Sequence, residues 1–269
     1  MMKHIYENII HGLCRDMKKS VKQMRKHFDD DDIHDFRLSV KKLRAFLGMV
    51  SLDSTCRRRL RIPGNIRRLF RKAGNLRDMR LFEKKALSFF TGNEKPVFFL
   101  KGLEAETSLC EKELYTHLHK NPCRDSVKAM IRKLPENDEP LAASFFYDEK
   151  KQMLQRLFAE KEITGHMFHI MRKHIKDLHV IRGLEMEYAG TASQAHFAQY
   201  HGLKNTENLA VQLGHFNDSS MLINFLSSFR FSQNAYADFD KVENFRQHCI
   251  HEREMQRINL LKQLNNISL

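Results

Sequence analysis

The 269-residue sequence has no tryptophan, only 5 prolines and only 11 glycines. Proline and glycine punctuate turn-rich β architectures, so their scarcity favours helices over a sandwich or barrel of short strands. No apolar run approaches the ~20 residues that a transmembrane helix requires, and the N-terminus lacks the uninterrupted apolar core of a signal peptide. The five cysteines (Cys14, Cys56, Cys110, Cys123 and Cys249) form no CxxC pair, which is typical of reduced thiols in a cytoplasmic protein.

Apolar residues recur every three to four positions along nearly the whole chain, which predicts an all-α protein. The expected helices cover residues 3–27, 32–52, 63–73, from there to about 90, 95–120, a short stretch after Pro122, 143–175, 176–190, 194–213, 217–230 and 238–264. Gly74-Asn75 and Gly214 are expected to end helices. The segment LPENDEP is expected to separate an N-terminal bundle, 1–137, from a C-terminal bundle, 138–269, within a single domain.

Positive charge is abundant and uneven. Lys and Arg number 46 against 33 Asp and Glu, a net charge of +13. Residues 1–140 hold 31 basic and 19 acidic side chains, whereas residues 141–269 hold 15 and 14. A surplus of this kind indicates a polyanionic partner, which could be nucleic acid, an anionic membrane or polyphosphate.

One predicted helix carries a basic row beside an apolar seam. Its seam repeats at intervals of three and four (Ile33, Phe36, Val40, Leu43, Leu47, Val50), and the row beside it does the same (His34, Arg37, Lys41, Arg44). Stacked like charges repel by a few tenths of a kcal/mol per pair, and this row contains no Glu to relieve them. We interpret the seam as bundle packing and the row as a phosphate-binding surface, with a solvated basic face as the alternative.

Similar rows recur elsewhere, and we predict that they converge on a common groove or pore. The candidate binding residues are Lys18, Lys22, His34, Arg37, Lys41, Lys42, Arg44, Arg67, Arg71, Arg77, Arg172, Lys176, His179, Arg182 and Arg253. Arginine grips phosphate oxygens in pairs with its planar fork, lysine adds a point charge, and histidine donates hydrogen bonds.

The order of two short motifs suggests a duplication. HDFR at 34–37 is followed by GNLRD at 74–78, and HVIR at 179–182 is followed by GHFND at 214–218. The same two motifs in the same order on both sides of the expected boundary predict two related halves.

The stretch HDFRLSVKKLRAFL resembles the signature helix of the CHAD family, the conserved-histidine α-helical domain. AGNLRDMRLF and LAVQLGHFNDSSML resemble two further segments of that family, and the likeness covers nearly the whole chain. The resemblance implies a stand-alone member with two antiparallel helical bundles related by a pseudo-twofold axis. It also implies a basic central pore or groove that binds inorganic polyphosphate. By this resemblance the binding residues of the first half are His34, Arg37, Lys41 and Arg44, and their partners in the second half are His179 and Arg182.

The chain departs from the family at GLEMEYAG, where Glu185 and Glu187 stand in place of further basic residues. This shifts the expected contribution of the second half towards Arg172, Lys176 and the last helix. Association with polyphosphate granules in the cytoplasm is expected at the level of the family, and no cofactor, metal or membrane partner is expected.

Two other functions remain open from the sequence. Basic helices also bind RNA, with strong salt dependence, although single-strand readers usually add exposed aromatic side chains for base stacking. A metal-dependent phosphohydrolase could use the His34-Asp35 pair or His166, His169 and His174. Arginines crowded against a divalent cation would weaken such a site, so we expect binding without catalysis.

Overall fold

A computed structural model describes residues 2–52, 59–91, 95–118, 126–135, 141–188, 206–229 and 237–264. These residues form helices and turns without a strand, so the all-α prediction is confirmed for the described part of the chain. The helices are α1 (Met2–Met24), α2 (Asp30–Val50), α3 (Gly64–Phe89), α4 (Val97–Leu118), α5 (Ser126–Ile131), α6 (Leu141–Phe158), α7 (Gly165–Tyr188), α9 (Thr206–Ser228) and α10 (Phe239–Leu264).

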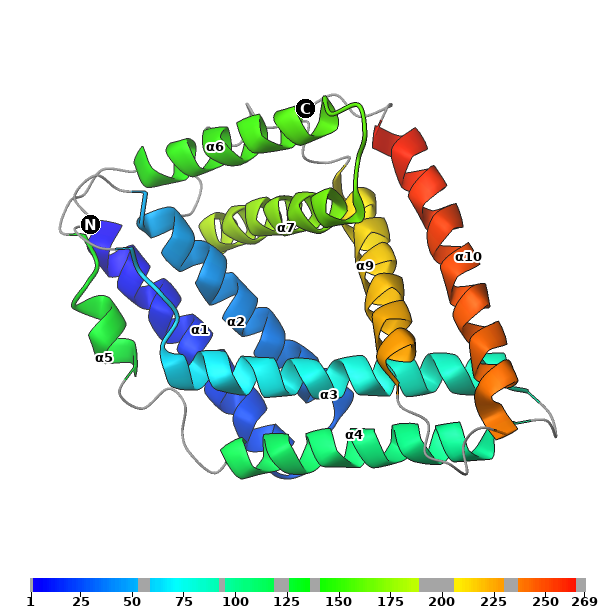
Figure 1. The fold of residues 1–269 in the computed structure, drawn as a ribbon. Helices are drawn as coiled ribbons and strands as arrows, with labels where there is room; N and C mark the ends of the chain where they lie inside the picture. The colour runs from blue at the N-terminus through cyan, green and yellow to red at the C-terminus, as the bar shows by residue number, and fades with distance from the viewer. Residues whose placement is uncertain are drawn as a thin grey trace.

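Consecutive long helices pack against each other, and helices of the first half also contact helices of the second half. Helix α1 packs on α2, α2 on α3 and α3 on α4, and in the second half α6 packs on α7, α7 on α9 and α9 on α10. The two halves touch where α2 meets α6 and α7, where α1 meets α7, and where α3 meets α9. Figure 1 shows α2, α3, α7 and α9 as the four sides of a frame, with the other long helices outside it.

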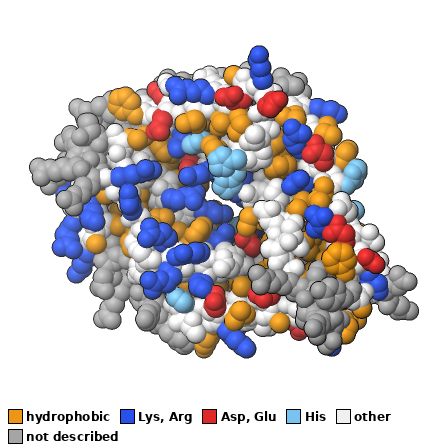
Figure 2. Space-filling view, in the orientation of Figure 1, with side chains coloured by type: hydrophobic (Ala, Val, Ile, Leu, Met, Phe, Trp, Pro, Cys, Tyr) orange, Lys and Arg blue, Asp and Glu red, His pale blue; other side chains and the backbone are white. Residues whose placement is uncertain are grey.

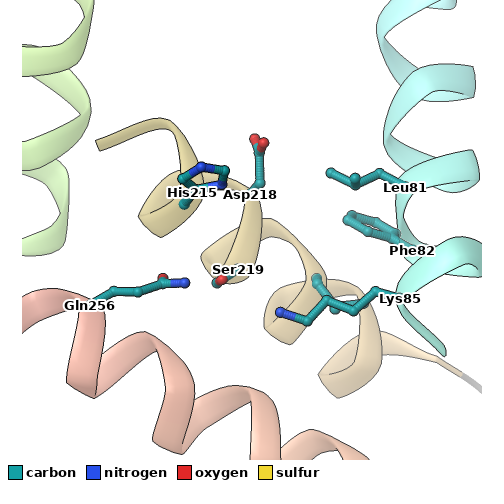
Figure 3. A pocket seen from close by; sticks show the side chains of 8 residues that line it. Leu81, Phe82, Lys85, His215, Asp218, Ser219 and Gln256 are labelled. Atoms are coloured by element: carbon teal, nitrogen blue, oxygen red, sulfur yellow. The ribbon is translucent and has the colours of Figure 1, made fainter. Parts of the chain in front are cut away.

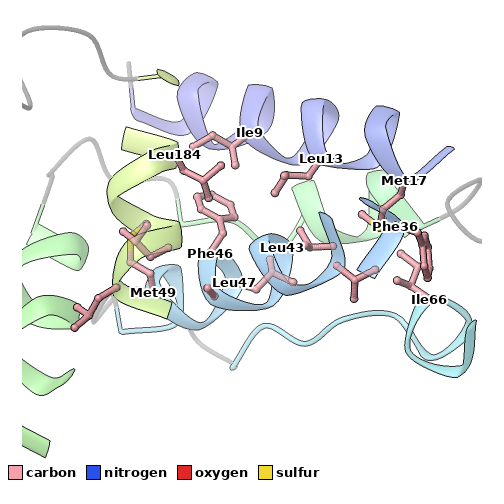
Figure 4. Packing of buried hydrophobic residues seen from close by; sticks show 14 of the residues in the cluster. Ile9, Leu13, Met17, Phe36, Leu43, Phe46, Leu47, Met49, Ile66 and Leu184 are labelled. Atoms are coloured by element: carbon pink, nitrogen blue, oxygen red, sulfur yellow. The ribbon is translucent and has the colours of Figure 1, made fainter. Parts of the chain in front are cut away.

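The start of α2 follows from its aspartates. Asp29 takes the extended backbone conformation of an N-cap, and three more aspartates occupy the first turn, where the positive end of the helix dipole favours them. The seam predicted for this helix is buried throughout. Figure 4 shows it packed against Ile9, Leu13 and Met17 of α1.

Two hydrophobic cores hold the helices, and both draw on the two halves. The larger core runs through α1, α2 and α7 and takes in parts of the other helices. The smaller core joins the ends of α3 and α9 to the starts of α4 and α10, with Phe89, Phe90, Phe99 and Phe245 in mutual ring contact. Neither half therefore buries its apolar side chains alone.

Four expected helix boundaries are wrong. Helix α3 continues through Gly74 and Asn75, α9 continues through Gly214, and α7 continues through the break expected between 175 and 176. Conversely, the helix expected over 143–175 is divided, because α6 ends at Phe158 and α7 begins at Gly165. Neither internal glycine ends its helix: Gly74 leaves room for Arg37, and Gly214 lies beside Arg172. The expected domain boundary falls mainly at 136–140, outside the described residues.

Candidate functional site

Charged side chains from the four frame helices face one another. We call this group the central cluster and define it as Arg37 and Lys41 of α2, Arg77 and Asp78 of α3, Arg172 and Lys176 of α7, and Asp218 of α9. The charges acting most strongly on its members come from within the group, apart from Arg44 at its edge. Five basic groups thus meet two carboxylates, so the cluster has a surplus of positive charge.

Arg37 is held in place by three contacts with α3. Its Nη1 donates a hydrogen bond to the carbonyl oxygen of Phe70 at 3.1 Å, and its guanidinium lies 4.7 Å from the centre of the Phe70 ring. A Cβ at Gly74 would overlap Nη1, so the absence of a side chain there lets the arginine lie on the helix. Burial lowers the pKa of Arg37, although an arginine stays protonated in proteins.

Arg77 lies between the two carboxylates of the cluster. Its Nη1 is 3.4 Å from Oδ1 of Asp78, and its Nη2 is 3.8 Å from Oδ2 of Asp218 on α9. Burial raises the pKa of Asp78, while Arg37 and Arg77 oppose that rise. Asp78 and Asp218 both lie inside helices, and both are paired with Arg77.

Arg172 occupies in the second half the place that Arg37 has in the first. A Cβ at Gly214 would lie 3.5 Å from its Nε, so this arginine also lies against a helix glycine. His169, Arg172 and Lys176 repeat the spacing of His34, Arg37 and Lys41. His169 contacts Asn217, the neighbour of Asp218, with 2.9 Å between Nδ1 and Oδ1.

From the order of motifs in this chain, HVIR at 179–182 was the predicted counterpart of HDFR at 34–37. His179 contacts Thr206 (Nε2 to Oγ1, 3.0 Å) and lies 4.0 Å from the Glu207 carboxylate, and Arg182 is one of the charges acting on it. The contacts of the two arginines with glycine thus favour HIMR, at 169–172, as the counterpart of HDFR. The spacing of Lys176 after Arg172, matching that of Lys41 after Arg37, was the signal in the sequence that could have identified it.

Arg44 and Glu185 have roles in packing between helices. Arg44 Nη2 lies 3.6 Å from Oδ1 of Asp177, a buried carboxylate on α7, and so joins α2 to α7. Glu185 accepts a hydrogen bond from the Tyr147 hydroxyl at 3.2 Å, and burial raises the pKa of Glu185 to about 7. The acidic departure from the family pattern therefore packs α7 against α6.

The remaining candidate residues do not belong to the central cluster as defined. Exposed positions are occupied by Lys18 and Lys22 on α1, His34 on α2, and Arg67 and Arg71 on α3, whereas Lys42 and Arg253 are half-buried. Figure 2 shows Lys and Arg side chains gathered over α2 and the first half of α3 on the visible face.

Two nitrogens of the cluster lack a hydrogen-bond acceptor. Within the described residues, the buried Nε atoms of Arg37 and Arg172 have no partner. A buried donor left unpaired costs about 1–3 kcal/mol. Together with the surplus of positive charge, this favours an anionic ligand that supplies several oxygen acceptors.

A small pocket adjoins the cluster on the side of α10 (Figure 3). It has a volume of about 120 Å³, and Asp218, His215, Ser219, Lys85 and Gln256 supply its polar lining. Asp218 is thus shared between this pocket and the ion pair with Arg77. The pocket is too small for a polymer, so we place the candidate site at the cluster itself.

Comparison with known proteins agrees with the fold. The sequence profile of the CHAD domain matches residues 8–227, and the chain therefore belongs to the CHAD domain family. The crystal structure of the CHAD domain from the plant Ricinus communis is similar over 99% of this chain and 92% of that chain, with a TM-score of 0.73 and 15% identity. No curated protein matches the chain.

The described residues lack a metal-binding group and a membrane-spanning helix. They contain no group of three or more His, Cys, Asp or Glu side chains placed to hold a metal ion. They also contain no helix that combines the length and the apolar character needed to cross a membrane.

Proposed function

We propose that this protein binds inorganic polyphosphate at the central cluster and performs no chemistry on it. The observation that carries the proposal is the convergence of Arg37, Lys41, Arg77, Arg172 and Lys176 from three helices, with only Asp78 and Asp218 as counter-charges within the cluster. A chain of phosphates supplies repeated negative charge and many acceptor oxygens, including partners for the two unpaired Nε atoms.

The aromatic residue of the site favours a ligand without bases. The Phe70 ring already lies against the Arg37 guanidinium, 4.7 Å away, and so supports a cation. Proteins that bind single-stranded RNA usually offer free aromatic faces on which successive bases stack. Contacts to phosphate oxygens alone suit a polymer that consists of phosphate throughout.

A charge-reversal experiment tests the proposal. Long-chain polyphosphate and an RNA of matched charge are titrated into the protein at about 150 mM salt, where the Debye length is ~8 Å. Arg37→Glu/Lys41→Glu is compared with Lys101→Glu/Lys112→Glu, which makes the same change in net charge at exposed positions of α4. We expect the cluster variant to lose polyphosphate affinity by more than about tenfold and the α4 variant by less than about threefold.

Three results would contradict the proposal. RNA that binds as tightly as polyphosphate would indicate a general nucleic-acid surface. Equal losses in the two variants would mean that net charge, rather than the cluster, governs binding. Phosphate released from the polymer on addition of Mg²⁺ or Mn²⁺ would indicate an enzyme. Circular dichroism checks that both variants remain helical, and localisation of a tagged protein tests association with polyphosphate granules.

A further inference from the structure

Lys41 is a lysine set among arginines, and it is half-buried. Its neighbours in the cluster are Arg37 on its own helix, Arg77 of α3, and Arg172 and Lys176 of α7. Each of these four charges opposes a positive charge on Lys41. The group is therefore a cation that lacks a close counter-ion and is partly removed from water.

The carboxylates around α2 already have arginine partners. The charged groups facing this region are Arg37 and Arg44 of α2, Arg77 and Asp78 of α3, Lys150 of α6, Arg172, Lys176 and Asp177 of α7, and Asp218 of α9. The carboxylates of Asp78 and Asp218 pair with Arg77, and that of Asp177 pairs with Arg44. Helix α1 packs on α2 through apolar side chains (Figure 4).

Electrostatics support the same conclusion. Burial above all, followed by the charges of Arg37, Arg172, Lys176 and Arg77, lowers the pKa of Lys41 from 10.5 to about 7. At pH 8 about nine in ten copies would then be neutral in the free protein. The arginines around it stay charged at every pH of interest, because the guanidinium does not deprotonate in proteins.

We propose that polyphosphate binding drives the uptake of one proton from solvent by Lys41, so that the affinity of the site falls as the pH rises above neutrality. This inference rests on the function proposed above. Phosphate oxygens placed among the cluster supply the negative charge that the free site lacks, and they favour the ammonium over the neutral amine. The proton comes from the buffer and is returned to it when the polymer leaves.

The sign of the pH dependence follows from linkage. Well below pH 7 Lys41 is charged in both free and bound protein, so it contributes no slope. Above pH 7 the free protein loses this proton and the complex keeps it, so affinity falls by up to about tenfold for each pH unit. The slope ends where Lys41 also deprotonates in the complex.

Lys176, the counterpart of Lys41 on α7, is expected to contribute less. Burial above all, followed by Arg172 and Arg77, lowers the pKa of Lys176, but Asp218 opposes this shift, whereas no carboxylate is among the main charges acting on Lys41. A change at Lys41 therefore isolates the effect. The conservative replacement is arginine, which keeps the positive charge but does not titrate between pH 6 and 9.

The experiment is calorimetric titration of long-chain sodium polyphosphate into the whole protein at pH 6.5 and 8.0. Each titration is made in two buffers that differ in ionisation enthalpy, because the difference in heat counts the protons taken up. Wild type is compared with Lys41→Arg and with Lys19→Arg, a control at an exposed position of α1. At pH 8.0 we expect wild type and Lys19→Arg to take up nearly one proton more than Lys41→Arg, and at pH 6.5 we expect the difference to shrink to about a quarter of a proton.

The outcomes separate this inference from the function on which it rests. Tight binding with equal proton uptake in wild type and Lys41→Arg overturns the inference and leaves polyphosphate binding intact. Absence of binding to wild type at both pH values overturns both. Lys41→Met is a second variant in case arginine does not fit at this position. Its polyphosphate affinity should be the same at the two pH values once proton uptake by other groups is subtracted. A wild-type slope that persists in Lys41→Met would assign the proton to another residue.

Discussion

At the scale of single residues, Arg37 and Arg172 differ in how closely they approach the helix glycine behind them. A Cβ at Gly74 would collide with the end of the Arg37 side chain, whereas a Cβ at Gly214 would make an ordinary contact with Arg172. A side chain added at Gly74 should therefore move Arg37 without removing it, and the same change at Gly214 serves as the control because it should leave Arg172 in place.

We predict opposite outcomes for alanine at these two glycines. In a helix interior, alanine is favoured over glycine by up to about 1 kcal/mol. Gly214→Ala should gain that stability and leave polyphosphate binding unchanged. Gly74→Ala should gain little, because Arg37 must give up its hydrogen bond and its contact with Phe70, and affinity should fall roughly threefold to tenfold. Thermal unfolding and binding titration measure the two effects, and equal behaviour of the variants would contradict this account.

At the scale of elements, the start of α4 is capped from far along the chain. The backbone N–H of Phe99 donates to Oδ2 of Asp238, just before α10, at 2.9 Å, and the Asp238 side chain is buried. This bond satisfies one of the free N–H groups that open a helix and ties α4 to α10. It lies beside the smaller core, where the same two helices meet.

Loss of this cap should therefore destabilise the protein. We expect Asp238→Ala to lower the free energy of unfolding by about 1–3 kcal/mol, because a buried N–H loses its acceptor. Asp240→Ala, at an exposed position in the first turn of α10, should cost less than about 1 kcal/mol. Urea denaturation followed by circular dichroism measures both variants. Equal costs would mean that the bond to Phe99 contributes nothing.

Helix positions were predicted correctly where neighbouring residues determine them, and wrongly where contacts with residues distant in the sequence determine them. The seam and aspartate start of α2 follow from spacing and helix electrostatics, and both were predicted. Gly74 and Gly214 were interpreted as helix ends because the residues near them in the sequence do not indicate that each glycine contacts an arginine of another helix. In the site, the row with Arg37 and Lys41 was predicted, and Arg172 was included, but its equivalence to Arg37 depends on packing against Gly214.

At the scale of the whole molecule, the two halves share both cores. Side chains of α1 and α2 pack with those of α7 in the larger core, and α3 and α4 meet α9 and α10 in the smaller one. Each half alone would leave these surfaces exposed to water, at a cost of roughly 25 cal/mol for each Å². The central cluster likewise takes groups from both halves, so the proposed binding site forms only when the two halves are together.

We predict that residues 1–137 and 138–269, produced as separate chains, do not fold independently. Each should show weak, non-cooperative thermal unfolding, and an equimolar mixture should regain the helicity, the cooperative transition and the polyphosphate binding of the intact chain. Circular dichroism and size-exclusion chromatography follow the reassembly. Two fragments that unfold cooperatively on their own would instead indicate two autonomous domains.

Asp78 and Asp218, which pair with Arg77, mean that an incoming anion must make several contacts at once to bind there. With Asp78 at 3.4 Å and Asp218 at 3.8 Å, this guanidinium already has internal counter-ions that a newcomer must displace or outnumber. A lone phosphate competes with them one contact at a time. In a polymer, each anchored unit raises the effective concentration of the next, so avidity grows with chain length. Under the proposed function, the aspartates would make the site select by chain length, because long polyphosphate would outcompete them and single phosphate ions would not.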